Sequence, residues 1–337
     1  MSAARRFPSQ VRLAASRRFN IKKSLITKGA YILYMKRVVV LLLNAVMTAF
    51  MACADVLYVK PGATGSGASW ADAADLAEAV RRAREGSGVT TIYAAKGVYT
   101  QTETLKLNGS VALYGGFAGA SAEETPETRD LKENATIISG DVNGNNRADE
   151  GDCGLFKVTG GHVKFEGIHF RHGYIDQPIS ATLKGQIGAG IYVNGIAAST
   201  SVTVVNCEFR DNLTMADNNV SGSVTGGPCA LVQAGVFKAR DTRFVNNHGS
   251  TGGRGGAVRF NSDEACGFFD RCLFSGNILP GKFGSAIQLS GGHLCINNST
   301  FIDNVGESGV INGVSLWGNA AYLNQMRLQS ICRTPDK

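Results

Sequence analysis

The chain has 337 residues and a formal net charge of +7, but the positive charge is concentrated at its beginning. Residues 1–54 contain ten Lys or Arg and no acidic residue, whereas the rest has 24 basic and 27 acidic side chains, a net charge of −3. A mature chain that begins after residue 54 is therefore not basic, which removes the charge argument for a nucleic-acid partner.

Residues 35–54 have the organisation of a secretory signal peptide. The basic pair Lys36-Arg37 precedes an apolar run from Val38 to Phe50, and Ala52-Cys53-Ala54 matches an A-x-A cleavage site. The apolar run is short for a membrane-spanning helix. We therefore expect cleavage after Ala54 and an exported protein, secreted or at the cell surface or outer membrane, with no transmembrane helix once the signal is removed.

Two questions about this leader stay open. Lipidation at Cys53 is the alternative to cleavage after Ala54, although Phe50 stands where a lipobox usually has an aliphatic residue. Residues 1–34 are interpreted as a non-native or upstream extension, because signal peptides rarely carry so long a basic preface.

Residues 55–150 are expected to form an N-terminal cap and the first turns of a repetitive fold. Ser69 through Glu85 predicts a helix, with Ser69 as its cap and an apolar face that includes Leu76 and Val80, ended by Gly86. Such a helix is suited to cover the open end of a stack of strands. Strands are predicted at residues 55–60, 91–99, 110–117 and 136–139.

The loop from Asp141 to Asp152 has the spacing of a calcium-binding loop. Oxygen-bearing side chains stand at its positions one, three, five, nine and twelve, namely Asp141, Asn143, Asn145, Asp149 and Asp152. It departs from that pattern at the sixth position, which is Asn146 where calcium loops have Gly, and at the twelfth, which is Asp where they have Glu. Calcium is the one cofactor that the sequence suggests, and a polar excursion without a ligand is the competing interpretation.

A Phe followed three residues later by Asn recurs through residues 151–320. The anchors, with a first relative at Phe170, are separated by 39, 35, 30 and 27 residues, a range typical of solenoid repeats. Apolar or small residues two and five positions before each Phe predict one short strand per repeat with one buried face. The four complete pairs are Phe209/Asn212, Phe244/Asn247, Phe274/Asn277 and Phe301/Asn304.

A glycine-rich motif precedes each anchor and predicts a second strand. Its copies begin at Gly188, Gly226, Gly255 and Gly284, and each leads into an alternating apolar pair. Helical periodicity is absent from residues 155–320. Short strands that bury no face alone must stack, so the prediction is an all-β parallel β-helix. In such a stack the anchor Asn side chains would sit at corners, tolerate left-handed torsions and form an amide ladder.

The paired motifs resemble the polymorphic outer membrane protein repeat, as in Gly-Gly-Ala-Val at 255–258 with Phe-Ser-Gly-Asn at 274–277. The resemblance covers residues 160–320 and implies a right-handed parallel β-helix of the pectin lyase-like group. Members of this group are typically secreted or outer-surface proteins, several of them adhesin-like. The resemblance therefore implies a location and a class of protein, but it does not imply a particular chemical activity.

The eight cysteines do not predict a disulfide framework. Cys207 and Cys272 share one inward column two repeats apart, roughly 9 to 10 Å, which exceeds disulfide reach. Cys229 is assigned to the column of Ile191 and Val258, as a small buried hydrophobe. The scattered histidines, including His169 and His172, are expected to be solvated and not to bind metal.

Two functions compete, and no catalytic residue is assigned. The favoured function is a non-catalytic, adhesin-like scaffold for a glycan or a surface protein. The alternative is a polysaccharide lyase or a glycoside hydrolase. Such an enzyme would need converging carboxylates or a base with calcium. Alternating charges on neighbouring repeats are interpreted first as cross-repeat ion pairs, namely Arg240, Asp241, Asp270 and Arg271. Together with Lys164, Arg171, Arg210 and Lys238, the same residues are the candidates for an acidic-glycan site.

The last repeat is less regular. Val314, Leu316 and Asn319 suggest another anchor-like unit, only 15 residues after Phe301. Residues 321–337 are predicted to form an irregular tail without a recognisable cap, so a shortened chain or a partner on an open end are both considered.

Overall fold

The computed structural model describes residues 55–86, 88–175, 186–196, 199–215, 224–225, 227–249, 256–279, 286–306, 314–316 and 320–329. They belong to the unit Ala54–Lys337, and the other unit, Met1–Cys53, lies outside the described residues. The expected extension and signal peptide, with Cys53, therefore stay predictions.

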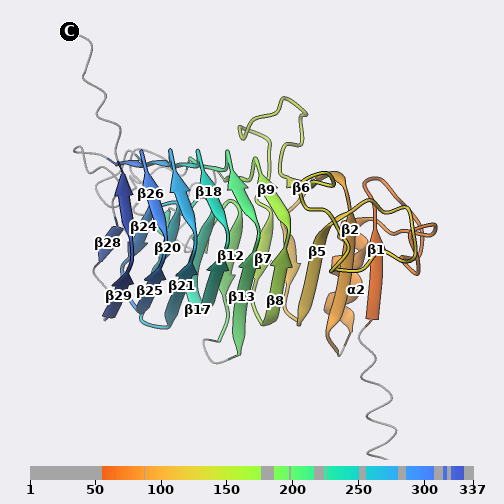
Figure 1. Ribbon diagram of the computed structural model, residues 1–337, viewed down its shortest axis with the longest axis horizontal. Helices are drawn as coiled ribbons and strands as arrows, with labels where there is room; N and C mark the ends of the chain where they lie inside the picture. Colours follow the sequence, from red (N-terminus) through yellow and green to blue (C-terminus); the bar gives the residue numbers. More distant parts are fainter. Residues whose placement is uncertain are drawn as a thin grey trace, which may run out of the picture. The chain divides into compact units, whose positions relative to one another are not determined.

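The described residues are mainly β-strands that pair in parallel and stack into sheets (Figure 1). The strands of sheet A appear in Figure 1 as a row of arrows from β1 to β29. In stacking order they are β1 (Asp55–Val59), β2 (Thr90–Ala95), β5 (Val111–Phe117), β8 (Gly161–Glu166), β13 (Thr200–Val205), β17 (Ala230–Arg240), β21 (Ala265–Asp270), β25 (His293–Asn297) and β29 (Ala320–Asn324).

Three further sheets and one strand pair complete the stack. Sheet B contains β3 (Gly97–Thr100), β6 (Thr136–Ser139), β9 (Ile168–Arg171), β14 (Glu208–Arg210), β18 (Arg243–Val245), β22 (Leu273–Ser275), β26 (Thr300–Ile302) and β30 (Arg327–Gln329). Sheet C contains β4 (Leu105–Leu107), β7 (Phe156–Val158), β12 (Ile191–Asn194), the first half of β17, β20 (Val258–Phe260), β24 (Ile287–Leu289) and β28 (Val314–Leu316). Sheet D contains β10 (Tyr174–Ile175), β15 (Leu213–Thr214), β19 (His248–Gly249), β23 (Ile278–Leu279) and β27 (Val305–Gly306), and β11 (Gln186–Ile187) pairs with β16 (Val224–Thr225).

Successive repeats visit these sheets in one order. The chain passes from sheet C to A, then to B and D, as in β20, β21, β22 and β23, and then begins the next repeat at β24. Each strand pairs with its counterpart one repeat away. The predicted all-β class and the stacking of parallel strands are therefore confirmed, as expected for a solenoid.

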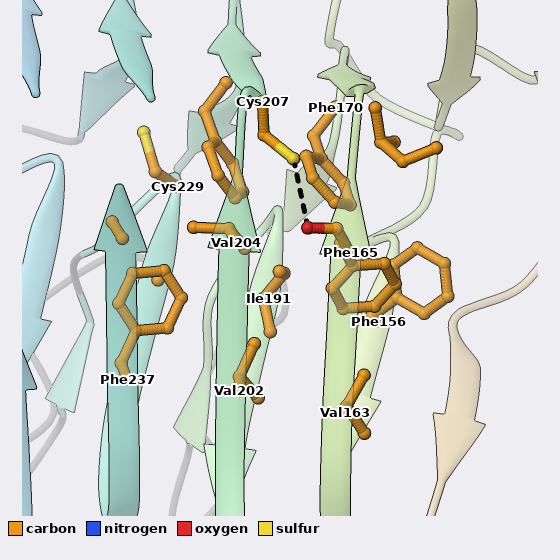
Figure 2. Packing of buried hydrophobic residues seen from close by; sticks show 14 of the residues in the cluster. Phe156, Val163, Phe165, Phe170, Ile191, Val202, Val204, Cys207, Cys229 and Phe237 are labelled. Atoms are coloured by element: carbon orange, nitrogen blue, oxygen red, sulfur yellow. Dashed lines mark hydrogen bonds between the residues drawn. The ribbon is translucent and has the colours of Figure 1, made fainter. Parts of the chain in front are cut away.

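The core lies inside these sheets, and phenylalanines are its largest fully buried side chains (Figure 2). The anchors occupy one register position of sheet B, so that Phe209 pairs with Phe244 and Phe244 with Phe274. Their rings stack, with centroids 4.4 to 5.1 Å apart from Phe170 to Phe301. This spacing follows the strand separation of about 4.8 Å, so register and ring stacking support each other.

The anchor asparagines form the expected amide ladder, and all four are fully buried. Three hydrogen bonds link them, each from one Nδ2 to the Oδ1 of the next Asn, over 2.9 Å from Asn212 to Asn247 and 2.7 Å from Asn277 to Asn304. The expected left-handed torsions lie elsewhere, at residues just before the ladder such as Asp211 and Asn246, with φ of 56° and 53°. The sharp bend precedes each Asn because the Asn side chain is held inside the stack.

The sequence alignment of the glycine motif was wrong by one residue in one repeat. Ala230, not Cys229, pairs with Ile191 and Val258, and Val232 pairs with Val193 and Phe260 two residues further on. The error arises because an alternating strand has the same pattern in two registers when both of its faces are buried, as they are here. Cys229 is nevertheless fully buried, as predicted.

The helix is shorter than predicted. Helix α2 spans Leu76–Glu85, and Asp75 caps it by accepting a hydrogen bond from the Ala77 amide. Ser69 instead closes a turn by accepting from the Asp72 amide over 3.2 Å. The helix begins late because Ala74 bridges to Val59, which keeps that segment extended. Its apolar face joins the core cluster that also contains Leu105 and Leu107 of β4.

The end of the described chain is also more regular than predicted. Strands β29 and β30 extend sheets A and B within the expected irregular tail. Val314 and Leu316 belong to β28 of sheet C, so they are not an anchor unit, and Leu328 is the residue that pairs with Phe301. Asn319 and residues 330–337 lie outside the described residues.

Candidate functional site

A shallow pocket of about 610 Å³ lies on the outer face of sheet A. Alternation along β8, β17 and β21 turns Lys164, Lys238 and Phe268 outward, and the register places them in one row across the stack. Arg240 and Asp270 form the pair next to them. The pocket therefore joins four of the predicted charged residues with the exposed ring of Phe268, which was not predicted as a site residue.

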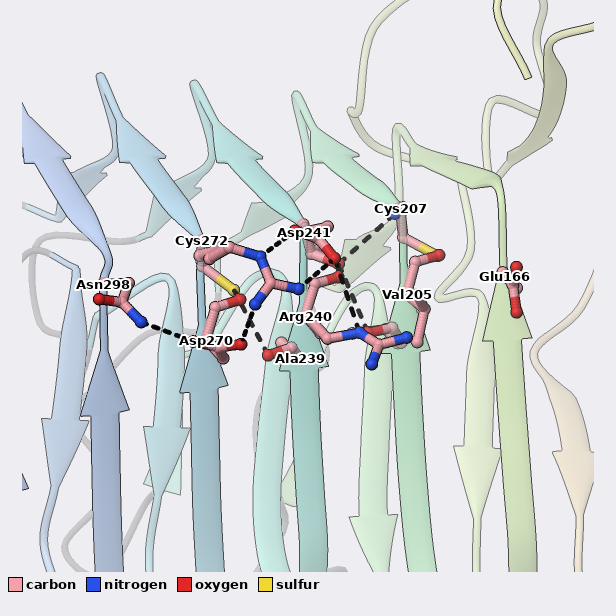
Figure 3. Close-up of polar contacts among 12 residues, drawn as sticks. Glu166, Val205, Cys207, Ala239, Arg240, Asp241, Asp270, Cys272 and Asn298 are labelled. Carbon is pink, nitrogen blue, oxygen red and sulfur yellow. Dashed lines mark hydrogen bonds and ion pairs between the residues drawn. The ribbon is translucent and has the colours of Figure 1, made fainter. Parts of the chain in front are cut away.

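The predicted charges at the end of these strands form ion pairs, both within one repeat and between neighbouring repeats (Figure 3). Arg271 donates to both carboxylate oxygens of Asp241, over 2.7 and 2.8 Å, and also contacts Asp270. Asn298 of the following repeat donates to Asp270 over 3.1 Å. The Arg271 hydrogen bonds hold the pKa of Asp241 below its ordinary value. The interpretation as cross-repeat ion pairs is confirmed for Arg271 with Asp241, whereas Arg240 pairs with Asp241 of its own repeat.

A second carboxylate beside the pocket is engaged as well. Glu166 accepts from Arg129 and lies 2.7 Å from the Lys164 ammonium. The ammonium also lies 4.8 Å from the ring centroid of Tyr114. Lys164 is thus partly neutralised, whereas Lys238 is exposed and has no ion pair among the described residues.

The remaining predicted cations, Arg171 and Arg210, lie on sheet B, away from the pocket. Both surround the carboxylate of Glu208, with Arg210 Nε 2.8 Å and Arg171 3.6 Å from it. Arg243 of the next strand approaches to 3.6 Å. Burial alone would raise the pKa of Glu208, but the Arg210 hydrogen bonds and the adjacent positive charges hold it below the ordinary value.

Glu208 and Arg243 were missed as candidate site residues, although the sequence contains a signal for them. Both immediately precede an anchor Phe, a position that faces outward when the anchor faces inward. Their charges are opposite and one repeat apart. That combination predicts contact between them once the register is known.

The calcium-like loop is closed by its own hydrogen bonds. Asp141 accepts from the amides of Gly144, Asn145 and Asn146, over 2.8 to 3.1 Å. Asn146 has a φ of 59°, so it takes the left-handed conformation that Gly usually supplies at the sixth position. Asp149 accepts from the side-chain amides of Asn143 and Asn145.

The twelfth residue, Asp152, accepts from the amides of Val142 and Asp149 over 2.9 and 3.0 Å. The loop thus brings all five predicted residues together. Among the described residues, no group of three or more His, Cys, Asp or Glu side chains is arranged to hold a metal ion. Calcium binding by this loop stays a prediction.

The histidines of the first repeat are less solvated than expected. His172 is buried at a left-handed corner and lies 3.2 Å from the Ser139 hydroxyl. His169 is half-buried beside Glu208. Burial lowers the pKa of both imidazoles. Both are solvated less than the sequence suggests because neighbouring strands cover them, His169 beside Glu208 of β14 and His172 beside Ser139 of β6.

The six cysteines of the described residues are free thiols, in agreement with the distance argument for Cys207 and Cys272. Figure 2 shows Cys207 directed into the core, where its thiol contacts the Phe165 carbonyl. Burial raises the pKa of Cys207 and of Cys272 to about 12. Such thiols are unreactive at neutral pH.

No known protein-family model matches this chain, and no curated protein matches it. The described residues contain no helix that is long and apolar enough to cross a membrane. The site must therefore be judged on its chemistry alone. It offers cations and an aromatic ring on an outer β-sheet face, beside carboxylates that are already bound by arginine or lysine.

Proposed function

We propose that the protein is an exported, non-catalytic scaffold that binds an acidic glycan on the outer face of sheet A. The observation that carries this proposal is the shared pocket of Lys164, Lys238 and Arg240 with exposed Phe268. Its nearby carboxylate, Asp270, is engaged by Arg271 and Asn298. The pocket therefore has positive charge for uronate carboxylates and an aromatic surface for the apolar face of a sugar ring.

The fold that presents this pocket is a right-handed parallel β-helix related to polymorphic outer membrane protein repeats, with α2 as its N-terminal cap. The repeated passage through sheets C, A, B and D supports it. The burial of Leu76, Val80 and Ala83 against the first strands supports the cap. A crystal structure with left-handed or open sheets would reject this assignment.

The enzyme alternative, a polysaccharide lyase or glycoside hydrolase, has weaker support from the charges. A catalytic acid needs a raised pKa near working pH, whereas the pKa of Asp241 is lowered by Arg271. Glu166 and Asp270 lie three strand positions apart in sheet A, about 14 Å by strand spacing. The carboxyl pairs of glycosidases are separated by about 5 to 10 Å.

The binding proposal is tested with oligogalacturonate and a neutral oligosaccharide of equal length. Isothermal titration should detect the acidic ligand only, and K238Q/R240Q should bind it at least roughly tenfold more weakly, since charge-assisted hydrogen bonds are lost. The matched control is K132Q, which removes an exposed charge from the loop after β5.

Equal affinity of the wild type and K238Q/R240Q would reject the pocket as the binding site. Release of unsaturated or reducing ends from a polyuronate would reject the non-catalytic assignment and establish the enzyme alternative. Binding without turnover, lost in K238Q/R240Q and kept in K132Q, supports the proposal.

A further inference from the structure

Three arginines meet on the outer face of sheet B, on a surface distinct from the sheet A pocket. The register pairs Arg171 of β9 with Arg210 of β14, and Glu208 of β14 with Arg243 of β18. His169 of β9 pairs with Glu208 on the other side. Adjacent strands thus place three guanidinium groups around one carboxylate, within two strand spacings, or about 10 Å.

The single carboxylate does not use the hydrogen-bonding capacity of this cluster. Arg210 donates to Glu208 over 2.8 and 3.4 Å, but Arg171 and Arg243 approach it only to 3.6 Å, beyond hydrogen-bond distance. Each guanidinium has five N–H donors and no acceptor. Arg171 Nε and His169 Nδ1 are buried and have no hydrogen-bond partner among the described residues.

The charge of the cluster is also unbalanced. Three guanidinium groups face one carboxylate, and the side chains of Arg171 and Arg243 are 30% and 56% exposed. Asp211, which follows β14, is the other carboxylate whose charge reaches Arg210. Like charges on adjacent strands destabilise a sheet unless a counter-charge lies between them. Glu208 supplies one negative charge between the strands, and the exposed arginines carry positive charge that it does not balance.

Arg271 is an example of an arginine in this protein whose guanidinium group is fully paired with carboxylates. It donates to both oxygens of Asp241 over 2.7 and 2.8 Å and contacts a second carboxylate, Asp270. A planar carboxylate matches one guanidinium edge in this way. The sheet B cluster instead offers donors from three strands toward one region, a geometry that suits the several directions of a tetrahedral oxyanion.

We propose that Arg171, Arg210 and Arg243 form a second anion site, for the sulfate or phosphate group of an ester. Glu208 is a positioning residue, which holds the Arg210 side chain in place and does not contact the ligand. Arg171 and Arg243 supply the donors that Glu208 leaves unused. Because this surface belongs to sheet B, its ligand binds independently of the acidic glycan at Lys238.

The site is tested with glucose 6-sulfate, glucose 6-phosphate and unmodified glucose as probes, by isothermal titration at low ionic strength. We expect at least one ester to bind and glucose not to bind. R243Q should weaken ester binding roughly tenfold, since a charge-assisted contact is lost. R243K keeps the positive charge but loses the planar guanidinium, so its affinity for the ester should lie between those of the wild type and R243Q.

The control is K238Q, which alters only the sheet A pocket and should bind the esters as the wild type does. The more tightly bound ester identifies whether sulfate or phosphate is the natural group. Failure of both esters to bind the wild type, or equal binding by R243Q, would overturn the proposal. Neither result would affect oligogalacturonate binding at Lys238, so the two proposals fail separately.

Discussion

At the scale of single residues, the asparagine ladder is the strongest polar feature of the interior. Asn247 donates to Phe209 O, Val245 O and Asn277 Oδ1, and its Oδ1 accepts from the backbone and side-chain amides of Asn212. It is fully buried. Removing it leaves donors and acceptors of two neighbouring repeats unpaired where water cannot reach them, a larger loss than that of one hydrogen bond.

We therefore expect N247A to lower the free energy of unfolding by about 2 to 4 kcal/mol. The measurement is equilibrium urea denaturation, followed by circular dichroism. The control is N297A, because Asn297 lies on the outer face of sheet A, where its side-chain amide has the Cys295 sulfur, at 3.7 Å, as its one hydrogen-bond partner among the described residues. That variant should change stability by no more than about 0.5 kcal/mol. Equal losses in both variants would refute a special role for the ladder.

Glu208 gives a prediction about acid stability. Its folded-state pKa is depressed below the ordinary value of 4.5, so its contribution is complete above pH 4.5 and is lost as the pH falls through the folded-state pKa. The depressed pKa values of His169 and His172 act in a different window, as the pH falls below 6.5. The two windows can be separated by titration.

We expect E208Q to lose less stability than the wild type between pH 4.5 and more acidic conditions, because it lacks the titrating carboxylate. The check is a series of urea denaturation curves from pH 7 downward for both proteins. Between pH 6.5 and 4.5 both should lose stability through the histidines. Parallel curves below pH 4.5 would show that Glu208 contributes nothing to acid sensitivity.

At the scale of elements, residue type was sufficient to predict the anchor strands of sheet B, from β9 to β26. The Phe anchors alternate with outward charged residues such as Glu208 and Arg243, and only one face can enter a core. Sheet C was harder, because Leu231 and Arg259 on its outer face are buried as deeply as its inner residues. Apolar residues can then stand on either face of the strand, so the sequence pattern does not fix its register. This explains the one-residue register error at Cys229.

The cations of the sheet A pocket were predictable from the sequence, whereas their grouping and the contribution of Phe268 were not. Lys164, Lys238 and Arg240 were chosen for their charge, but a one-dimensional pattern did not separate them from Arg171 and Arg210. The sheet on which a residue lies depends on where the chain bends. The bends occur at residues with left-handed backbone conformation, and these residues are of several types, including an arginine. Arginine has no general preference for that conformation, so those corners carry little signal.

The loop from Asp141 to Asp152 is the element whose chemistry can be tested most directly. Its oxygens already accept local hydrogen bonds, which calcium would have to replace, so we expect weak binding, in the millimolar range known for extracellular calcium modules. Millimolar calcium should raise the melting temperature of the wild type and not of D149N, an isosteric change of one proposed ligand.

Magnesium is the matched control for this experiment, since it demands a tighter octahedral site. The melting temperature of D149N without calcium separates loop folding from ion binding, because Asp149 also accepts the Asn143 and Asn145 amides. An unchanged melting temperature of the wild type in calcium, together with no heat on titration, would leave the loop as a polar excursion.

At the scale of the whole molecule, the two proposed anion sites must work by local charge. Without residues 1–54 the chain has a net charge of −3, so the protein as a whole does not attract anions. Interactions between exposed charges are screened beyond about 8 Å at physiological ionic strength. Clusters such as Lys164 with Lys238, or Arg171 with Arg243, can therefore bind anions on a weakly acidic protein, and their affinity should fall as salt is added.

This charge argument depends on removal of the leader, which gives the last prediction. We expect mass spectrometry of the protein exported by its native host to show a chain that begins at Asp55, because Ala52-Cys53-Ala54 is the best cleavage signal in the sequence. Such a chain should bind an anion exchanger at pH 8, whereas the full chain, at +7, should bind a cation exchanger. A diacylglycerol mass on Cys53 would establish the lipid anchor instead. An intact N-terminus in the cell interior would contradict export, and with it the assignment of the protein to the cell surface.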